Sequence, residues 1–242
     1  MSRYRPLTAA AVLILLSGCF NAPSGSSNGS ASSGPNFANG NVTADSQGGH
    51  SVNGMVRVPD GEKTGDLSTV NGSIQIGNNV TLATARTVNG SISVGNHTSA
   101  DALSTVNGSI TLADGVHVSQ TVRSVNGALS LDSGDAIRGS IANVNGAIHL
   151  NAAYVGGGIT TANGDITVEG ASHVDGGILV EKIESGWFQL SSTPRVVIGP
   201  GSVVTGTLRF DRKVELYVST NAKIGPVIGA TPQRYPGEGP IG

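Results

Sequence analysis

Short aliphatic segments recur at a fixed interval along most of this chain. In residues 69–77, "TVNGSIQIG", the side chains of Val70, Ile74 and Ile76 are predicted to face one way, with polar residues facing the other. Such period-two alternation indicates β-strands, because successive side chains of a strand point to opposite faces. A glycine or another turn residue follows, and then a second aliphatic group. Each unit therefore holds about three short strands separated by bends.

An asparagine–glycine pair lies at the centre of every unit, and successive pairs are 18 or 19 residues apart. The pairs are Asn53–Gly54, Asn71–Gly72, Asn89–Gly90, Asn107–Gly108, Asn126–Gly127, Asn145–Gly146 and Asn163–Gly164. Self-similarity at a fixed period predicts a repeat architecture. We expect each asparagine to turn a corner and each glycine to adopt a backbone conformation that other residues avoid.

Two architectures can use such a repeat. Asn-Gly is a strong signal for a type I′ β-hairpin turn, which would give a meander or a barrel. In a β-solenoid, each unit is instead one coil that stacks on the next. A solenoid also explains why the flanking Val, Ser and Ile recur, because equivalent side chains pack about 4.8 Å apart along the axis. We therefore predict an all-β fold, a single-stranded β-solenoid with about 18 residues per coil, and a ladder of hydrogen-bonded asparagine amides.

The solenoid is predicted to occupy residues 50–228, with regular coils over 51–169 and irregular terminal coils over 170–228. Trp187, the single tryptophan, and Phe188 fall in the irregular part, where they either close the core or form a ligand platform. Residues 19–49 are rich in Gly, Ser and Asn and predict a flexible tether, because they cannot bury enough apolar surface to offset chain entropy. Residues 229–242 are predicted to be a disordered tail.

The N-terminus has the pattern of an export signal. Arg3 and Arg5 precede an apolar run over 7–16, which is shorter than the roughly 20 residues of a membrane-spanning helix. The run ends in "LSGC", and Cys19 is the only cysteine of the chain. This segment resembles the lipobox of bacterial lipoproteins; the alternative is an ordinary secretory signal with a coincidental cysteine. The resemblance implies a signal peptide over 1–18 and acylation of Cys19, with palmitate among the acyl chains. Phe20 after the cysteine, in place of Asp, implies sorting to the outer membrane.

Composition narrows the functional classes. Charged residues make up 12% of the chain and the net charge is −2, so there is no basic footprint for nucleic acid. The five histidines show no metal-ligand spacing. Asp165, Glu169 and Asp175 lie near one another, but no basic residue occupies a matching repeat position. We therefore predict no catalytic, cofactor or metal site.

The units resemble a bacterial adhesin-like β-strand-repeat family, domains of unknown function with recurrent "T-x-N/S-G-x-I-x-V" coils. The resemblance covers residues 51–169 and implies a β-solenoid on an exported or membrane-associated protein. It carries over no catalytic residue. The later coils are more loosely similar to bactofilin-like polymer-forming proteins, which join end to end.

Together these features predict a non-enzymatic envelope lipoprotein that presents a β-solenoid as a structural, adhesin-like or scaffolding module. Its expected partners are the membrane, through the lipid anchor, and a cell-wall polymer or an envelope protein. Self-assembly into a polymer is the alternative, and an envelope carbohydrate-active enzyme is a lesser one. One outer face of the solenoid is expected to be lined by Gln75, Ser93, Thr111, Ser130, His149 and Thr167.

Overall fold

The computed structural model describes residues 37–182 and 193–237. These residues contain strands, turns and bends, and every pairing between named strands is parallel. The chain therefore winds as a β-solenoid, as the repeat period predicted. Asn-Gly does not close β-hairpins in this structure.

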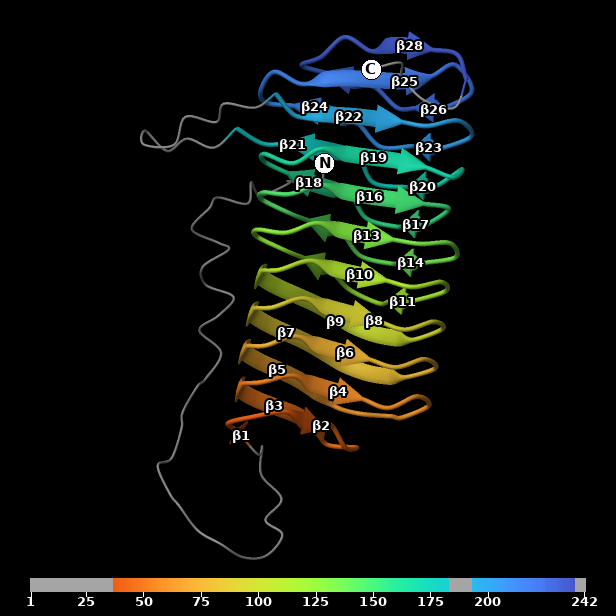
Figure 1. The fold of residues 1–242 in the computed structure, drawn as a ribbon. Helices are drawn as coiled ribbons and strands as arrows, with labels where there is room; N and C mark the ends of the chain where they lie inside the picture. Colours follow the sequence, from red (N-terminus) through yellow and green to blue (C-terminus); the bar gives the residue numbers. More distant parts are fainter. Residues whose placement is uncertain (1–36, 183–192, 238–242) are drawn as a thin grey trace, which may run out of the picture.

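Two parallel sheets form the walls of the solenoid (Figure 1). The first, here called the front sheet, takes one strand from each coil. Its strands are β2 (Val42–Thr43), β4 (Val56–Val58), β6 (Ile74–Ile76), β8 (Ile92–Val94), β10 (Ile110–Leu112), β13 (Leu129–Leu131), β16 (Ile148–Asn151), β19 (Ile166–Glu169), β22 (Arg195–Ile198), β25 (Glu215–Ser219) and β28 (Gln233–Tyr235).

The second sheet, here called the back sheet, takes the remainder of each coil. It begins with undivided strands, β1 (Phe37–Ala38), β3 (Gly48–Asn53), β5 (Asp66–Asn71), β7 (Thr81–Asn89) and β9 (Ser99–Asn107). Later coils divide the same path into two strands separated by a bend. These pairs are β11 (His117–Val118) and β12 (Val122–Arg123), β14 (Ala136–Ile137) and β15 (Ile141–Ala142), β17 (Tyr154–Val155) and β18 (Ile159–Thr161), β20 (His173–Val174) and β21 (Ile178–Val180), β23 (Val203–Val204) and β24 (Leu208–Phe210), and β26 (Lys223–Ile224) and β27 (Val227–Ile228).

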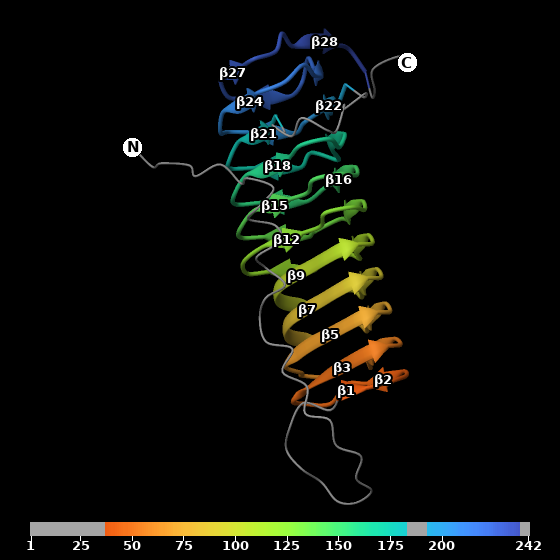
Figure 2. The ribbon, with the colours of Figure 1, turned by 90° about the vertical axis from the view of Figure 1, so that its left-hand side faces the viewer.

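The solenoid winds with a right-handed sense. In Figure 1 the front-sheet strands run from left to right while the chain climbs from orange to blue. In Figure 2, turned by 90°, β5, β7 and β9 run toward the front sheet, which agrees with that winding. The sense matches the strong preference of parallel crossover connections for right-handedness.

The stacking register of the front sheet keeps the 18- or 19-residue period from β4 to β19 and departs from it in the terminal coils. The step is 14 residues from Val42 to Val56, 20 from Arg195 to Glu215 and 16 from Tyr217 to Gln233. Asparagines in successive coils are bonded across 18 or 19 residues. Between β19 and β22 the step is 30 residues, from Asp165 to Arg195. Ile166 nevertheless pairs with Val196, so the core continues through the step. The added length includes Trp187 and Phe188, which lie outside the described residues.

Aliphatic side chains from both sheets fill a single core along the axis. The prediction that the motif valine faces inward is wrong: Val70 is half-exposed, and Thr69 before it is buried, with 2% exposed. The chain stays extended through β5, so Leu67 and Thr69 share the inner face, and the Asn-Gly corner then resets the alternation for Ile74. Burying a hydroxyl requires a hydrogen-bond partner.

That partner is the corner glycine of the preceding coil. Thr69 Oγ1 donates to the backbone oxygen of Gly54 at 3.0 Å, and Thr87 Oγ1 donates to that of Gly72 at 2.9 Å. Thr105 and Ser124 repeat the contact with Gly90 and Gly108, and the Asn143 amide makes it with Gly127. A buried polar row therefore joins the coils on the inside of the corner.

The predicted asparagine ladder is confirmed on the outside of the same corner. Each Nδ2 donates to the Oδ1 of the asparagine one coil earlier at 2.8–2.9 Å. The ladder joins Asn39, Asn53, Asn71, Asn89, Asn107, Asn126 and Asn145. At the next corner, the Arg212 guanidinium donates to Asn163 Oδ1 at 3.2 Å and to the Ala162 backbone oxygen at 2.9 Å.

Asn39 lies within the segment predicted to be a flexible tether, and that boundary is corrected. β1 pairs with β3, and β2 pairs with β4, so the solenoid already includes residues from Phe37 onward. The repeat pattern did not reveal this coil, because its sequence "ANGNV" has the Asn-Gly pair but lacks the flanking Ser or Thr of the other units.

The predicted reason for glycine at the corner holds in only part of the stack. Gly127 and Gly146 have a positive φ, of 159° and 130°, but Gly72, Gly90 and Gly108 do not. Instead, a Cβ at each of them would collide with the carbonyl group of the corner glycine one coil earlier. Left-handed residues lie at the other turn of the coil, where Ala152 has φ 51° and Ala171 has φ 60°. Glycine is therefore required at the Asn-Gly corner by the close stacking of coils.

The C-terminal end is ordered where a disordered tail was predicted over 229–242. β28 pairs with β25, and the Tyr235 side chain is buried, with its hydroxyl donating to the Ile198 backbone oxygen at 3.3 Å. Arg234 donates to the Ser219 backbone oxygen at 3.0 Å. Pro232 and Pro236 flank the strand, and proline cannot donate to a further strand. This segment, residues 229–237, closes the upper end of the core and is called the C-terminal cap.

Gly90→Ala is expected to destabilise the solenoid by about 3 kcal/mol, because the new Cβ meets a backbone carbonyl that cannot move without separating two coils. The matched control is Gly134→Ala. Gly134, unlike Gly90, has a left-handed conformation with φ 80°, and a Cβ there has its nearest neighbour at 3.6 Å, so we expect a cost of about 1 kcal/mol. Thermal unfolding followed by circular dichroism measures both. Equal losses in the two variants would contradict the stacking argument.

Ending the chain after Thr231 removes β28 and most of the C-terminal cap, and is expected to expose the core residues Leu216 and Val218 beneath β28. Amide hydrogens of β25 should then exchange much faster, while those of β7 keep their protection, because distant coils open independently. Hydrogen exchange read by mass spectrometry resolves the two strands. Unchanged protection of β25 would show that the cap does not stabilise this end.

Candidate functional site

The outer surface of the front sheet carries one polar side chain at the centre of each strand. Register pairs Gln75 with Ser93, Ser93 with Thr111, and Thr111 with Ser130. The column continues through His149 and Thr167. The prediction that these six residues line one outer face is therefore confirmed.

Charged and aromatic side chains gather on the C-terminal part of this face. His149 Nε2 lies 3.2 Å from Glu169 Oε1. The Arg195 guanidinium lies 4.8 Å from the centre of the Tyr217 ring, and the Arg195 backbone N–H donates to Asp165 Oδ1 at 2.8 Å. Arg195 thus sits one coil beyond Asp165.

This placement corrects the prediction that no basic residue occupies a position matching the acidic residues. The 30-residue step between β19 and β22 displaces Arg195 from the 18-residue period used to align the sequence. Spacing alone therefore could not bring Arg195 and Asp165 together. Asp175, the third acidic residue, lies on the back sheet, away from Asp165 and Glu169.

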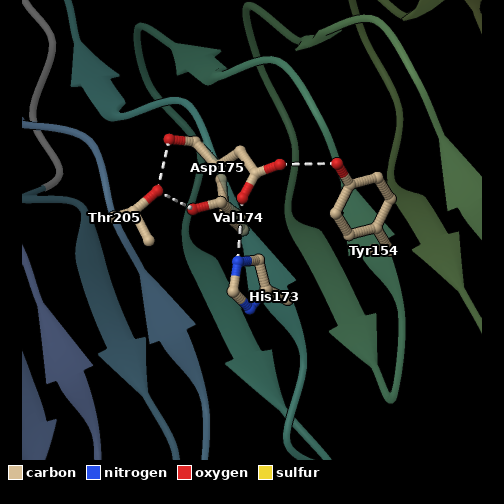
Figure 3. Close-up of polar contacts among 5 residues, drawn as sticks. All are labelled: Tyr154, His173, Val174, Asp175 and Thr205. Carbon is tan, nitrogen blue, oxygen red and sulfur yellow. Dashed lines mark hydrogen bonds and ion pairs between the residues drawn. The ribbon is translucent and has the colours of Figure 1, made fainter.

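An exposed cluster of hydrogen-bonded side chains lies on the back sheet and is called the Tyr154 cluster: Tyr154, His173, Asp175 and Thr205 (Figure 3). Tyr154 Oη donates to Asp175 Oδ2 at 2.5 Å, and His173 Nε2 lies 2.8 Å from Asp175 Oδ1. Thr205 Oγ1 donates to the Asp175 backbone oxygen at 2.6 Å. The cluster therefore joins three successive coils around Asp175, two of them at its carboxylate and the third at its backbone oxygen.

Strand geometry explains how these side chains meet. His173 and Asp175 are alternate residues, so both project outward while Val174 between them is buried. Register then places Tyr154 beside His173, and their rings stack with centroids 6.0 Å apart. A Cβ at Gly156 would lie 3.2 Å from Tyr154 Oη, so the missing side chain leaves room for the hydroxyl to reach Asp175.

The hydrogen bonds set the charge of the cluster. The hydrogen bond from Tyr154, followed by the contact with His173, holds the pKa of Asp175 below its usual value. The same bond to Asp175 raises the pKa of Tyr154. At neutral pH the cluster therefore presents an ionised carboxylate and a protonated phenol that acts as the donor. This arrangement can accept hydrogen bonds from hydroxyl or amide groups and can offer aromatic surface to a ligand.

Sequence reasoning named Asp175 but missed Tyr154 and His173. The position equivalent to Tyr154 is Ala136 one coil earlier, and Ala136 in turn pairs with His117. The sequence did contain a signal, because Tyr154 and His173 place aromatic rings at the same variable repeat position in two adjacent units. It was overlooked because the alignment centred on the Asn-Gly corner, which lies at the other end of the coil.

A buried carboxyl group occupies the turn that follows the front sheet. Asp135 has 1% of its surface exposed, and its carboxylate accepts from the Val116 N–H at 2.7 Å and the Asp132 N–H at 2.8 Å. Burial, with smaller contributions from the nearby Asp132 and Asp114, raises the pKa of Asp135 to about 7, and the two N–H donors oppose this rise. Thr98 fills the same position two coils earlier, and its hydroxyl accepts from the Val80 N–H.

The raised pKa of Asp135 predicts that the solenoid loses stability with rising pH. An unfolded carboxyl group has a pKa near 3.9, so its raised pKa contributes stability that is complete below about pH 4 and is lost as pH rises toward 7. The loss is on the order of a few kcal/mol. Asp135→Thr, which copies Thr98, should flatten this dependence. Thermal midpoints measured at pH 4, 5.5 and 7.5 test it, and an unchanged slope in the variant would contradict the assignment to Asp135.

The predicted structural residues occupy their expected place, since the Asn-Gly pairs from Asn53–Gly54 to Asn163–Gly164 all lie at the stacked corner. Cys19 lies outside the described residues. Over 37–182 and 193–237, no group of three or more His, Cys, Asp or Glu side chains is arranged to hold a metal ion. In the same part of the chain, no helix is long and apolar enough to cross a membrane.

Comparisons with protein-family models, with curated proteins and with solved structures each give no match for this chain.

Proposed function

We propose that this protein is a non-enzymatic envelope lipoprotein whose β-solenoid is a structural, adhesin-like module that holds an extended surface toward a cell-wall polymer. The observation that carries the proposal is the uninterrupted stack of parallel coils, in which each coil adds one outward position to a straight column. Such a surface suits a long, repetitive partner better than a small substrate, because its binding positions repeat along an axis.

The connections between coils support a load-bearing role. Backbone hydrogen bonds, the buried threonine row and the asparagine ladder all run along the axis. Pulling on one coil therefore acts on several parallel rows of bonds at once. A module of this kind keeps its outer surface in a constant geometry, which extended binding requires.

The sequence supports placement in the envelope. Cys19 ends a lipobox-like segment and precedes β1 by 18 residues, so a lipid on Cys19 would place the first coil near a membrane. The low net charge and the scattered polar residues suit an exported protein that faces solvent.

End-to-end self-assembly is the second candidate. It draws support from the general complementarity of one coil edge to the next, which every coil-to-coil pairing uses. The C-terminal cap argues against it, because Pro232 and Pro236 flank the last strand and Tyr235 fills the end of the core. We therefore favour a module that acts as a single solenoid.

Cys19→Ser is expected to move the protein from the membrane fraction to the soluble fraction and to abolish incorporation of labelled palmitate, because serine cannot be acylated as the lipobox cysteine is. Ser17→Thr, a small change two residues before the cysteine, is the control and should keep both signals. Fractionation and palmitate labelling of cells that express each form measure the effect. Membrane retention of the Cys19→Ser protein would contradict lipid anchoring.

The partner is tested with the Cys19→Ser protein, made without lipid and mixed with purified peptidoglycan sacculi. We expect the folded protein to sediment with the sacculi and the heat-unfolded protein to remain in solution. Sacculi treated with protease should retain the binding if the partner is the polymer. Absence of sedimentation, or its loss after protease treatment, would contradict a cell-wall polymer as the partner.

A further inference from the structure

We infer that the Tyr154 cluster is a binding site for a glycan chain that lies along the back sheet, parallel to the solenoid axis. The inference rests on the proposed function and names the site and the ligand class within it. It is carried by three features of the described residues: a break in the repeat, a pre-positioned carboxylate, and a strip of glycines beside it.

The break in the repeat is the pair of aromatic rings, Tyr154 and His173, in two adjacent coils of one outward column. The column that contains Tyr154 has Ser99 and Ala136 in earlier coils, with His117 between them. Tyr154 has 38% of its surface exposed, and His173 stacks on it from the next coil. Neither ring enters the core, so packing of the solenoid does not account for them. Exposed aromatic rings on a rigid strand are typical of ligand-contact positions.

The carboxylate is positioned before any ligand arrives. Tyr154 binds Oδ2 of Asp175, His173 binds Oδ1, and Thr205 holds the backbone oxygen of the same residue. Each carboxylate oxygen can accept more than one hydrogen bond, so both keep a lone pair for a ligand donor. Fixing the side chain in advance reduces the entropy lost on binding.

The strip of glycines runs next to the cluster in the same coils, because Gly176 follows Asp175 and Gly206 follows Thr205 in the chain. Gly157, Gly176 and Gly206 stack directly on one another, and a Cβ on Gly176 or Gly206 would collide with the glycine one coil earlier. Gly139 begins the strip and Gly225 continues it. These partly exposed positions carry no side chain, so an extended glycan can approach the backbone along the solenoid axis. The Tyr154 cluster would then contact one side of that glycan.

The chemistry of the cluster favours a glycan over other ligands. Its accessible groups are an ionised carboxylate, an imidazole, a threonine and aromatic edges, which match hydroxyl donors and the apolar C–H surface of sugars. A strongly anionic ligand would meet the Asp175 carboxylate. A metal ion would find only His173 and Asp175 as ordinary ligands, fewer than the three of a stable protein site.

The experiment uses the Cys19→Ser protein, with an N-acetylglucosamine tetramer as a soluble probe in calorimetric titration and with protease-treated sacculi in sedimentation. Asp175→Asn and Tyr154→Phe are the test variants. Asp175→Asn keeps the shape but removes the charge, and Tyr154→Phe removes the hydroxyl that positions the carboxylate. We expect each to weaken binding at least tenfold in both assays.

The matched control is Glu169→Gln, which alters the other exposed His–carboxylate contact, on the front sheet. It should change binding less than twofold. Circular dichroism and thermal midpoints establish that every variant is folded. Tenfold or greater weakening confined to Asp175→Asn and Tyr154→Phe supports the site.

Failures of the site and of the proposed function give different results. If the parent protein sediments with protease-treated sacculi but both test variants bind as tightly as the parent, the Tyr154 cluster is not the site and the proposed function stands. If Glu169→Gln weakens binding as much as the test variants, the loss of binding is not specific to the Tyr154 cluster, and the site inference is wrong. If the parent protein binds neither probe, the proposed function fails and the site inference fails with it.

Discussion

The close parallel stacking of coils at the Asn-Gly corner is the constraint on which the rest of this structure depends. The N–H of Gly72 donates to the Asn89 carbonyl at 3.0 Å, and the N–H of Gly90 donates to the Asn107 carbonyl at the same distance. These bonds bring the backbones so near that a Cβ at either glycine would strike the preceding coil. Once the backbones are this close, the side chains on both sides of the corner must stack as well. Asparagine amides then bond outside the corner, and threonine hydroxyls bond inside it.

The same stacking separates residues that build the solenoid from residues that are free to vary. Inward positions are occupied by aliphatic side chains in nearly every coil, because each one packs on its equivalent above and below. Outward positions meet only solvent and their neighbours in the column, so they tolerate serine, glutamine, histidine or tyrosine. Functional groups on such a fold accumulate in outward columns. The Tyr154 cluster, built from three coils, is an example of a site that one coil could not form.

A solenoid also has two ends, and its function depends on whether each end is covered or left open to pairing. Every internal coil satisfies its backbone groups through both neighbours, whereas the final coil has only one. In this protein the upper end is covered by a short strand between two prolines and by a buried tyrosine. A covered end suits a protein that works as a single module with a long exposed surface. The side walls then remain as the surfaces for partners.

The sequence by itself indicated the architecture, because an 18-residue period in which Val, Asn, Gly and Ile all recur favours stacked coils over hairpins. It also indicated the asparagine ladder and the front-sheet column, since residues at the same position of a repeat must lie one above another. It misplaced Val70 and Thr69 because alternation cannot be counted through a corner. It assigned Asn39 to the tether and Tyr235 to the tail because terminal coils deviate from the repeat. Only the tertiary structure brought Arg195 to Asp165 across a 30-residue step, and Tyr154 and His173 to Asp175. Those contacts form between coils, and the lateral register of coils with unequal lengths is decided by packing of the shared core.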